Sequence, residues 1–257
     1  MVVSNTFIEF ASEGVKGFTR VQPDVNLLIL SNLKSVDMKI SKPRPTLPLC
    51  LLLFFFFHHT IQSAEKNSAW VKLFNGKDLS GWHNPYSHGE ARVKNGIIEL
   101  VADKKFFLAH DNPVSDFILT SEIKLPLGQA NSGILFRSQK KENGTMFGYQ
   151  AEVDGSDRKW SGGLYDEGRR GWIHPKKPIE NPYNKENWTA ERKNAFKREE
   201  WNKYKIKCLG DRIQIWVNGV KTSDLRDGTD TKGLIAIQHH GEKGQVYQFR
   251  NLRLKKL

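Results

Sequence analysis

The segment Tyr149–Asp154 combines two acids and an amide at a spacing that suits chemistry. Side chains of a β-strand point alternately to its two faces, so Gln150, Glu152 and Asp154 share one face and apolar residues fill the other. Carboxyl groups can move protons, and an amide can donate to and accept from a sugar hydroxyl. The pattern is also typical of a strand face that only meets solvent, so both interpretations remain open for this segment taken alone.

Other segments repeat this arrangement of a polar face opposite an apolar one. Gln238 and His240 are expected to lie opposite the apolar pair Ile235 and Ile237. The remaining examples are Arg137, which is expected to face away from Ile134 and Phe136, and Tyr165 with Glu167, which share one side of their strand. If one sheet gathers these side chains, it forms a groove that holds acids, amides, bases and a phenol.

The stretch just past Tyr165 adds an aromatic candidate. Trp172 has a flat apolar face that could stack on a sugar ring, and it could equally be a residue that packs a loop. Arg169 and Arg170 could bind hydroxyls or acidic sugars, or could simply face water. These alternatives are left open by the sequence.

The elements that must position these residues are short strands. From residue 69 onward, apolar-alternating runs are broken by Gly, Asn, Asp and Pro, which is typical of an all-β sandwich or barrel. The predicted strands are Ile97–Val101, Phe117–Lys124, Ser132–Ser138, Tyr149–Val153, Gly162–Tyr165, Asn202–Leu209, Arg212–Val217, Leu234–His239 and Gln245–Lys255. Residues 174–200 show no period of two and are predicted to form a long surface loop, with one helical turn near Thr189–Lys197.

Composition narrows the class of protein. The formal net charge is +12, but Lys and Arg are spread along the chain among acids, and no nucleic-acid-binding motif is present. We therefore predict no nucleic-acid partner and interpret most of this charge as solvated surface. The chain has 2 Cys, and Cys208, in an alternating apolar pattern, is expected to be a buried, inert thiol. The sequence does not set an oligomeric state.

The residue pattern of the N-terminal part indicates that the protein is exported. Residues 47–57 are apolar and too short to span a bilayer as a helix, but they have the length of a signal-peptide core. Lys39, Lys42 and Arg44 precede this run, and Ser63 and Ala64 offer small residues for cleavage. We predict a signal peptide at 38–64, an over-long start or disordered segment at 1–37, no membrane span in the mature chain, and a secreted or periplasmic location.

The order of motifs from Leu73 to Leu257 resembles one family, the 3-keto-disaccharide hydrolase domain family. The matching segments are Leu73–Trp82, Asn131–Arg137, Gly148–Gln150, Gly162–Tyr165, Glu200–Asn202, Trp216–Gly219, Ile237–Gly241 and Phe249–Leu252. The resemblance implies that residues 69–257 form a concanavalin A-like jelly roll, a β-sandwich of two antiparallel sheets, with a site on the concave face of one sheet. It also implies action on glycosides oxidised at C3. There, the ketone acidifies the C2 proton, a base removes it, and the C1 substituent leaves, with water adding back in a hydrolase.

Such a site needs a base, an acid and a donor to the enolate oxygen. The catalytic candidates are Glu152, Asp154 and His240, with base and acid not assigned. The substrate-binding candidates are Arg137, Gln150, Tyr165, Glu167, Trp172 and Gln238. No cofactor is required by the sequence, although a set of His and acids can bind a divalent metal ion. This chain reads Gln150-Ala151-Glu152 where many family members carry Glu-x-Gln, which leaves the role of Glu152 open.

Two other functions suit the same fold. Glu152-Val153-Asp154-Gly155-Ser156-Asp157 is similar to the Glu-x-Asp-x-x-Glu motif of retaining endo-β-glucanases, in which two carboxylates flank the bond. The last position is Asp157, one methylene shorter than Glu. A non-catalytic, lectin-like carbohydrate-binding module is the other alternative, because a fold does not fix a function.

Overall fold

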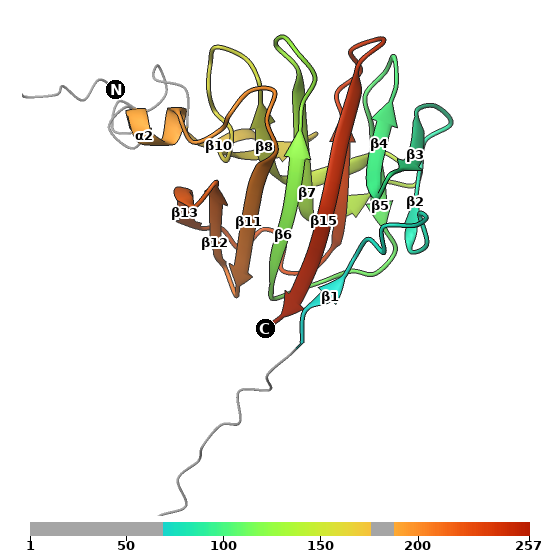
Figure 1. Ribbon diagram of the computed structural model, residues 1–257. Helices are drawn as coiled ribbons and strands as arrows, with labels where there is room; N and C mark the ends of the chain where they lie inside the picture. Colours follow the sequence, from blue (N-terminus) through green and yellow to red (C-terminus); the bar gives the residue numbers. More distant parts are fainter. Residues whose placement is uncertain (1–68, 176–187) are drawn as a thin grey trace, which may run out of the picture. The chain divides into compact units, whose positions relative to one another are not determined.

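The alternating runs that begin at residue 69 form two antiparallel sheets packed face to face in the computed structural model (Figure 1). The structure describes residues 69–175 and 188–257. The predicted signal peptide at 38–64 and the predicted over-long start at 1–37 lie outside the described residues. No helix in the described part of the chain is long and apolar enough to cross a bilayer.

Within residues 69–175 and 188–257, sheet A contains eight strands and sheet B seven. In sheet A the order is β13 (Val220–Arg226), β12 (Arg212–Val217), β11 (Asn202–Leu209), β6 (Phe117–Lys124), β15 (Val246–Lys256), β4 (Ile97–Val101) and β3 (Glu90–Lys94), with β1 (Val71–Lys72) beside β15. In sheet B it is β10 (Gly171–His174), β9 (Leu164–Glu167), β8 (Met146–Asp154), β7 (Asn131–Lys140), β14 (Leu234–His239), β5 (Phe106–His110) and β2 (Trp82–His83). This arrangement confirms the predicted all-β sandwich of two antiparallel sheets.

The core lies between the sheets and is filled by one face of each strand. On β11, Tyr204, Ile206 and Cys208 point inward, whereas the lysines between them are more exposed. Ile235 and Ile237 of β14 enter the same core from sheet B. Burial raises the pKa of the Cys208 thiol to about 12, so this thiol stays protonated and acts as a packing group.

Several strands begin and end at the predicted residues, namely β4, β6, β11, β12 and β14. The prediction missed β5 because Phe106–His110 is buried on both faces and shows no alternation. It also placed Trp172 in a loop, whereas the structure places it in the edge strand β10. The predicted helical turn is α2 (Ala190–Lys193), which begins after Thr189, whose side chain accepts a hydrogen bond from the Arg192 amide.

The outer face of sheet B, away from the core, has an apolar half and a polar half. Phe107, Ala109, Leu135, Met146 and Ala236 form a second buried cluster on this face, and Tyr86 packs against it. The Tyr86 hydroxyl accepts a hydrogen bond from the Met146 amide at 2.9 Å. This bond holds Tyr86 in place over the cluster. The polar half lies on the same face, farther along β8, β14 and β9, and carries the candidate site.

Candidate functional site

The polar half of this face contains a groove of about 420 Å³. All the predicted site residues except Arg137 line it, and the full set is Lys105, Gln129, Asn131, Gln150, Glu152, Asp154, Ser156, Arg158, Tyr165, Glu167, Trp172, Gln238, His240 and Glu242. The side chains of Gln150, Glu152 and Asp154 on β8 therefore point into a groove. They are buried, so this strand face does not simply meet solvent.

Strand register brings these residues together from separate parts of the chain. Gln150 pairs with Tyr165 of β9, and Tyr165 pairs with Trp172 of β10. Glu152 pairs with Gly133 of β7. On the other side of β7, Ile134 pairs with Ile237, so the same register sets Gly133 opposite Gln238. The floor of the groove thus runs across five neighbouring strands, from β10 through β9, β8 and β7 to β14.

Gly133 creates space at the centre of this floor. A Cβ atom built on Gly133 would lie 2.2 Å from Cδ and 2.5 Å from Cγ of Gln150, which is closer than side chains can approach. The amide of Gln150 therefore occupies the position that any other residue at 133 would fill. This glycine is needed for close approach and not for its backbone angles.

Glu152 is the most buried acid of the groove, with 3% of the residue exposed. Its Oε1 accepts hydrogen bonds from Asn131 Nδ2 at 2.7 Å and from Arg158 Nη2 at 2.8 Å, and its Oε2 accepts one from Gln150 Nε2 at 3.0 Å. Burial raises the pKa of Glu152 to about 7 in spite of these donors. This carboxyl group can therefore take up or release a proton near neutral pH.

Asp154 behaves differently although it is also buried. Arg158 Nε lies 2.9 Å from Oδ2, the Trp160 amide donates to Oδ2 at 3.0 Å, and the Ser156 amide donates to Oδ1 at 2.9 Å. Burial acts to raise the pKa of Asp154, but the hydrogen bonds from Ser156 and Arg158 outweigh it and hold the pKa below its usual value. Asp154 stays ionised and is suited to holding Arg158 in place.

Two buried amides in the groove have unused hydrogen-bonding capacity. Gln238 is 1% exposed, and neither Oε1 nor Nε2 has a hydrogen-bond partner among the described residues. Gln150 uses Nε2 for Glu152, but its Oε1 has no partner in the same part of the chain. Leaving a buried amide unpaired costs about 1–3 kcal/mol, so these atoms are available to pair with water or with a ligand in the groove.

The rim of the groove carries charged pairs. His240 is half exposed, and its Nδ1 lies 3.1 Å from Oε1 of Glu242. Lys105, which adjoins β5 beside β14, has its Nζ 2.6 Å from Oε1 of Glu167. Burial raises the pKa of Tyr165, so its hydroxyl remains protonated and available as a donor.

Arg158 is a groove residue that the sequence analysis did not single out. Its guanidinium carbon lies 4.7 Å from the ring centroid of Trp172 and 5.2 Å from that of Trp160. Arg158 therefore covers part of the aromatic surface that was predicted to stack on a sugar. The available clue was an arginine in the short turn that directly follows the acidic strand face, because loops at strand ends often carry functional groups.

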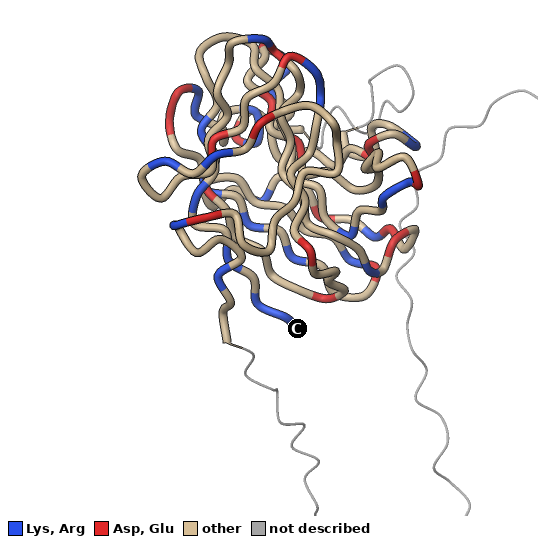
Figure 2. Tube along the Cα trace, turned by 90° about the vertical axis from the view of Figure 1, so that its right-hand side faces the viewer, with Lys and Arg blue, Asp and Glu red and all other residues tan. Residues whose placement is uncertain are grey.

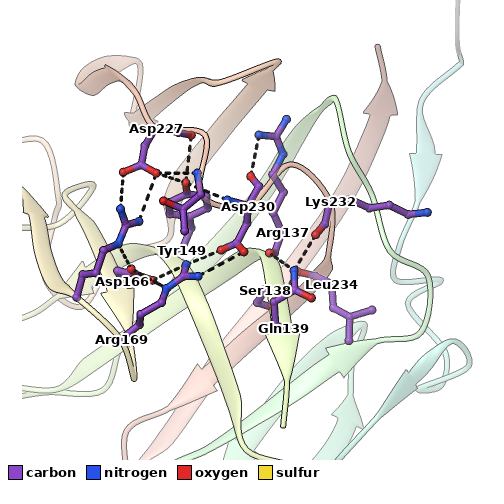
Figure 3. Close-up of polar contacts among 12 residues, drawn as sticks. Arg137, Ser138, Gln139, Tyr149, Asp166, Arg169, Asp227, Asp230, Lys232 and Leu234 are labelled. Carbon is purple, nitrogen blue, oxygen red and sulfur yellow. Dashed lines mark hydrogen bonds and ion pairs between the residues drawn. The ribbon is translucent and has the colours of Figure 1, made fainter.

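Arg137 does not join the groove, which corrects the prediction for this residue. A bulge in β7 shifts the register between Leu135 and Gln139, and Arg137 itself has a φ of +48°. The extra residue breaks the alternation and turns the side chain away from the groove, where it is fully buried. Its guanidinium donates to the carbonyls of Ser115 and Gly210 at 2.7 and 2.8 Å and to Asp116 at 2.8 Å. Figure 3 shows a further contact of Arg137, to the carbonyl of Asp230.

A cluster of ion pairs holds the turn between β9 and β10. Asp166 is fully buried and pairs with Arg169 and Arg170 (Figure 3). Arg169 continues to Asp230, and Arg170 continues to Asp227 at 2.8 Å. The β9–β10 hairpin carries Tyr165, Glu167 and Trp172. Arg169 and Arg170 thus attach this hairpin to the loop before β14. The main contacts of Arg169 and Arg170 are therefore these acids, and neither arginine lines the groove.

The described residues contain no group of three or more His, Cys, Asp or Glu side chains arranged to hold a metal ion. The two central acids, Glu152 and Asp154, are both bound by Arg158. Figure 2 shows Lys and Arg interspersed with Asp and Glu along the sandwich, as expected for a largely solvated charge distribution.

Comparison with known families decides the relationship of this domain. The family model of the 3-keto-alpha-glucoside-1,2-lyase-like domain matches residues 69–255. The chain belongs to this family. The match spans both sheets of the sandwich and confirms the resemblance seen in the sequence motifs. A comparison with curated proteins gives no match.

Solved structures similar to this 3-keto-alpha-glucoside-1,2-lyase-like domain share its fold. A presumed glycosyl hydrolase from Parabacteroides distasonis has a TM-score of 0.53 and 20% identity, covering 73% of this chain and 94% of that chain. The carbohydrate-binding module CBM66 from Bacillus subtilis has a TM-score of 0.50 and 17% identity, covering 68% of this chain and 96% of that chain. These likenesses support the jelly-roll sandwich, and the family places the domain among carbohydrate-related, glycosyl hydrolase-like proteins.

Proposed function

We propose that this domain cleaves 3-keto-glycosides by removing the C2 proton and releasing the C1 substituent. One observation carries the proposal. Glu152 is a nearly fully buried carboxyl group with a pKa of about 7 at the floor of a polar groove. A general base is most effective when its pKa lies near the working pH, and the C2 proton of a 3-keto sugar is acidic enough for such a base. Membership of the 3-keto-alpha-glucoside-1,2-lyase-like family supports the same chemistry.

The elimination divides its roles among the groove residues. The Glu152 carboxylate takes the C2 proton, and the electron pair of that C–H bond moves toward the C3 oxygen, which turns the C3 ketone into its enolate. The enolate then expels the oxygen at C1, and His240, whose Nδ1 lies 3.1 Å from Glu242 at the rim, is the proposed proton donor to the leaving oxygen. The products are an alcohol and a 1,2-unsaturated 3-keto sugar. Addition of one water molecule, with its hydroxyl going to C1 and its other hydrogen to C2, gives net hydrolysis.

The developing enolate needs donors that are already in position. Arg158 lies beside Glu152 and carries a permanent positive charge, and the Tyr165 hydroxyl is protonated at neutral pH. The unpaired amide atoms of Gln150 and Gln238 are suited to the sugar hydroxyls. In this proposal Asp154 is a positioning residue that acts through Arg158.

Mass analysis of products from 3-keto-glucosides tests the proposal, with unoxidised glucosides as the matched control. We expect the unsaturated keto sugar or its hydrate from the 3-keto substrates and no product from the control glucosides. Parallel reactions with and without chelator report whether a divalent metal contributes. A Glu152→Gln variant should lose turnover and retain binding.

Two other results would contradict it. Binding of sugars without any product from 3-keto substrates would favour a carbohydrate-binding module. Cleavage of plain β-glucans would favour a retaining glucanase, although the motif residue needed for that alternative, Asp157, has a side chain that is 78% exposed and pairs with Arg198. Asp157 does not line the groove.

We further propose that the domain acts outside the cytoplasm. The support is the apolar run at 47–57 with its basic flank and small residues at Ser63 and Ala64.

A further inference from the structure

A second hollow of about 330 Å³ adjoins the groove and shares Asp154 and Ser156 with it. The other lining residues are Lys159, Lys193, Asn194, Phe196, Lys197, Arg198 and Glu200. They come from the turn after β8 and from the segment that contains α2. We call this hollow the basic extension, because bases dominate its lining.

The charges of the basic extension are only partly neutralised. Arg198 pairs with Asp157 at 2.7 Å, and the acid Asp154 is engaged by Arg158. Lys159 Nζ lies 3.4 Å from the amide oxygen of Asn194, which is neutral. Lys193 and Lys197 form no side-chain ion pair with any other residue that the structure describes, and Glu200 is the one remaining acid of this lining.

The groove itself has the opposite character. Its acids are Glu152, Asp154, Glu167 and Glu242, against the bases Lys105 and Arg158. A substrate that spans both hollows therefore meets a more acidic surface around the reacting sugar and a basic surface beyond it. A neutral sugar unit suits the first environment, and a negative charge suits the second.

Building on the proposed function, we infer that the group attached at C1 of the substrate carries an anionic substituent, a carboxylate or a sulfate ester, that binds in the basic extension to Lys159, Lys193 and Lys197. Phe196 is half buried and offers an apolar wall, and Asn194 offers a partner for a hydroxyl, so the extension suits a second sugar unit with an acidic group. The lysines select substrates by charge and take no part in breaking the bond.

The test compares disaccharides that differ only in the charge of the second unit. A glucosyl–glucose, the same linkage to glucuronate, and the 6-sulfate of the second glucose are titrated calorimetrically against the Glu152→Gln protein. We expect roughly tenfold tighter binding of both anionic ligands. Each exposed pair between a lysine and the anion contributes less than about 1 kcal/mol, and a tenfold change in Kd corresponds to about 1.4 kcal/mol, so two or three such pairs together give this effect. The preference should disappear in about 1 M salt, where the Debye length is about 3 Å.

Two variants separate local from global charge. Lys159→Gln/Lys193→Gln/Lys197→Gln should bring the ratio of anionic to neutral affinity close to one. The control Lys94→Gln/Lys124→Gln/Lys207→Gln removes the same charge from strands of sheet A and should keep the ratio. An anionic preference that survives the first variant, or equal affinities in the parent protein, overturns the inference. Tighter binding of the glucuronate ligand alone, or of the sulfate ligand alone, supports the inference and identifies the anionic group as a carboxylate or as a sulfate ester.

Turnover of the 3-keto forms of these disaccharides is measured separately on the unmutated chain. Absence of turnover together with a lysine-dependent anionic preference overturns the proposed function and supports the charge selection. Turnover of the neutral and anionic 3-keto forms with equal kcat/KM retains the proposed function and overturns the inference.

Discussion

Glu152 titrates near neutrality because burial penalises its charged form more than its three hydrogen bonds favour it. The same burial makes the ionised carboxylate reactive toward a carbon acid, since little solvent stabilises it. The nearby Asp154, held by Arg158 and two backbone amides, has its pKa shifted downward. Two acids on one strand face are thus separated into a proton acceptor and a permanent anion by their local donors.

The acidic limb of the pH profile should report the ionisation of Glu152. If it is the base, kcat/KM on 3-keto substrates rises as pH increases through about 7, where the carboxyl group ionises. Glu152→Gln should lower kcat by about 100-fold or more, the range typical of a lost general base. Initial rates between acid and alkaline pH measure both effects. A variant with unchanged kcat would remove Glu152 from the mechanism.

The stability of the domain should also respond to this residue. The pKa of Glu152 is raised from 4.5 to about 7 on folding, so its contribution is fully present below pH 4.5 and is lost as pH rises through 7. The free energy of unfolding of Glu152→Gln minus that of the parent protein is therefore expected to be about 1–3 kcal/mol more positive at pH 8 than at pH 4. Urea unfolding at the two pH values tests this. A pH-independent difference would contradict the raised pKa.

Gly133 should tolerate no side chain while Gln150 stays in place. Gly133→Ala places a methyl group on Gln150 and is expected to destabilise the domain by about 1–3 kcal/mol, as overpacking does. Gly133→Ala/Gln150→Ala relieves the overlap and should recover most of that loss. A double-mutant cycle from denaturant unfolding measures the coupling. Additive effects would show that the two side chains do not compete for this space.

At the level of elements, the bulge in β7 separates what the sequence could predict from what it could not. Alternation placed Gln150, Glu152 and Asp154 correctly because β8 is regular across this stretch. It failed for Arg137 because the bulge inserts a residue, and no residue type in Leu135–Gln139 marks such a shift. The missed strand β5 is a second failure of the same kind, since its two buried faces leave no alternation to detect.

The two arginines at these elements should behave in opposite ways. Arg137→Met leaves buried carbonyls and Asp116 without their donor and should lower the free energy of unfolding by about 3 kcal/mol or more. Arg158→Met removes a side chain that is 37% exposed, so stability should change by less than about 1 kcal/mol, whereas kcat should fall by about 100-fold. Thermal unfolding and initial rates compare them. The reverse pattern would return Arg137 to the candidate site.

At the level of the whole molecule, the fold was predicted well because one pattern, short alternating runs with Gly and Asn turns, repeats throughout residues 69–257. The turn contacts that fix the β9–β10 hairpin were not predictable, because Asp166 lies far in sequence from Asp227 and Asp230 and is joined to them through Arg169 and Arg170.

Export is the prediction that belongs to the whole chain. Expression in a host with a secretory pathway should give a product whose first residue is Glu65, as read by N-terminal sequencing. A secreted product that retains residues 1–37 would contradict the proposed signal peptide.

The segment around Tyr86 has a consequence for the length of chain that the domain can process. Tyr86 packs on Phe107, with ring centroids 6.2 Å apart, and Phe107 pairs with Gln238 at the floor of the groove. The apolar half of the face is thereby covered, so under the proposed function a glycan lying in the groove would meet Tyr86 on that side. A polymer threaded through its middle would collide with Tyr86, so trimming from chain ends is favoured over internal scission. On soluble polysaccharides carrying oxidised termini, small sugars should then appear while solution viscosity stays nearly constant.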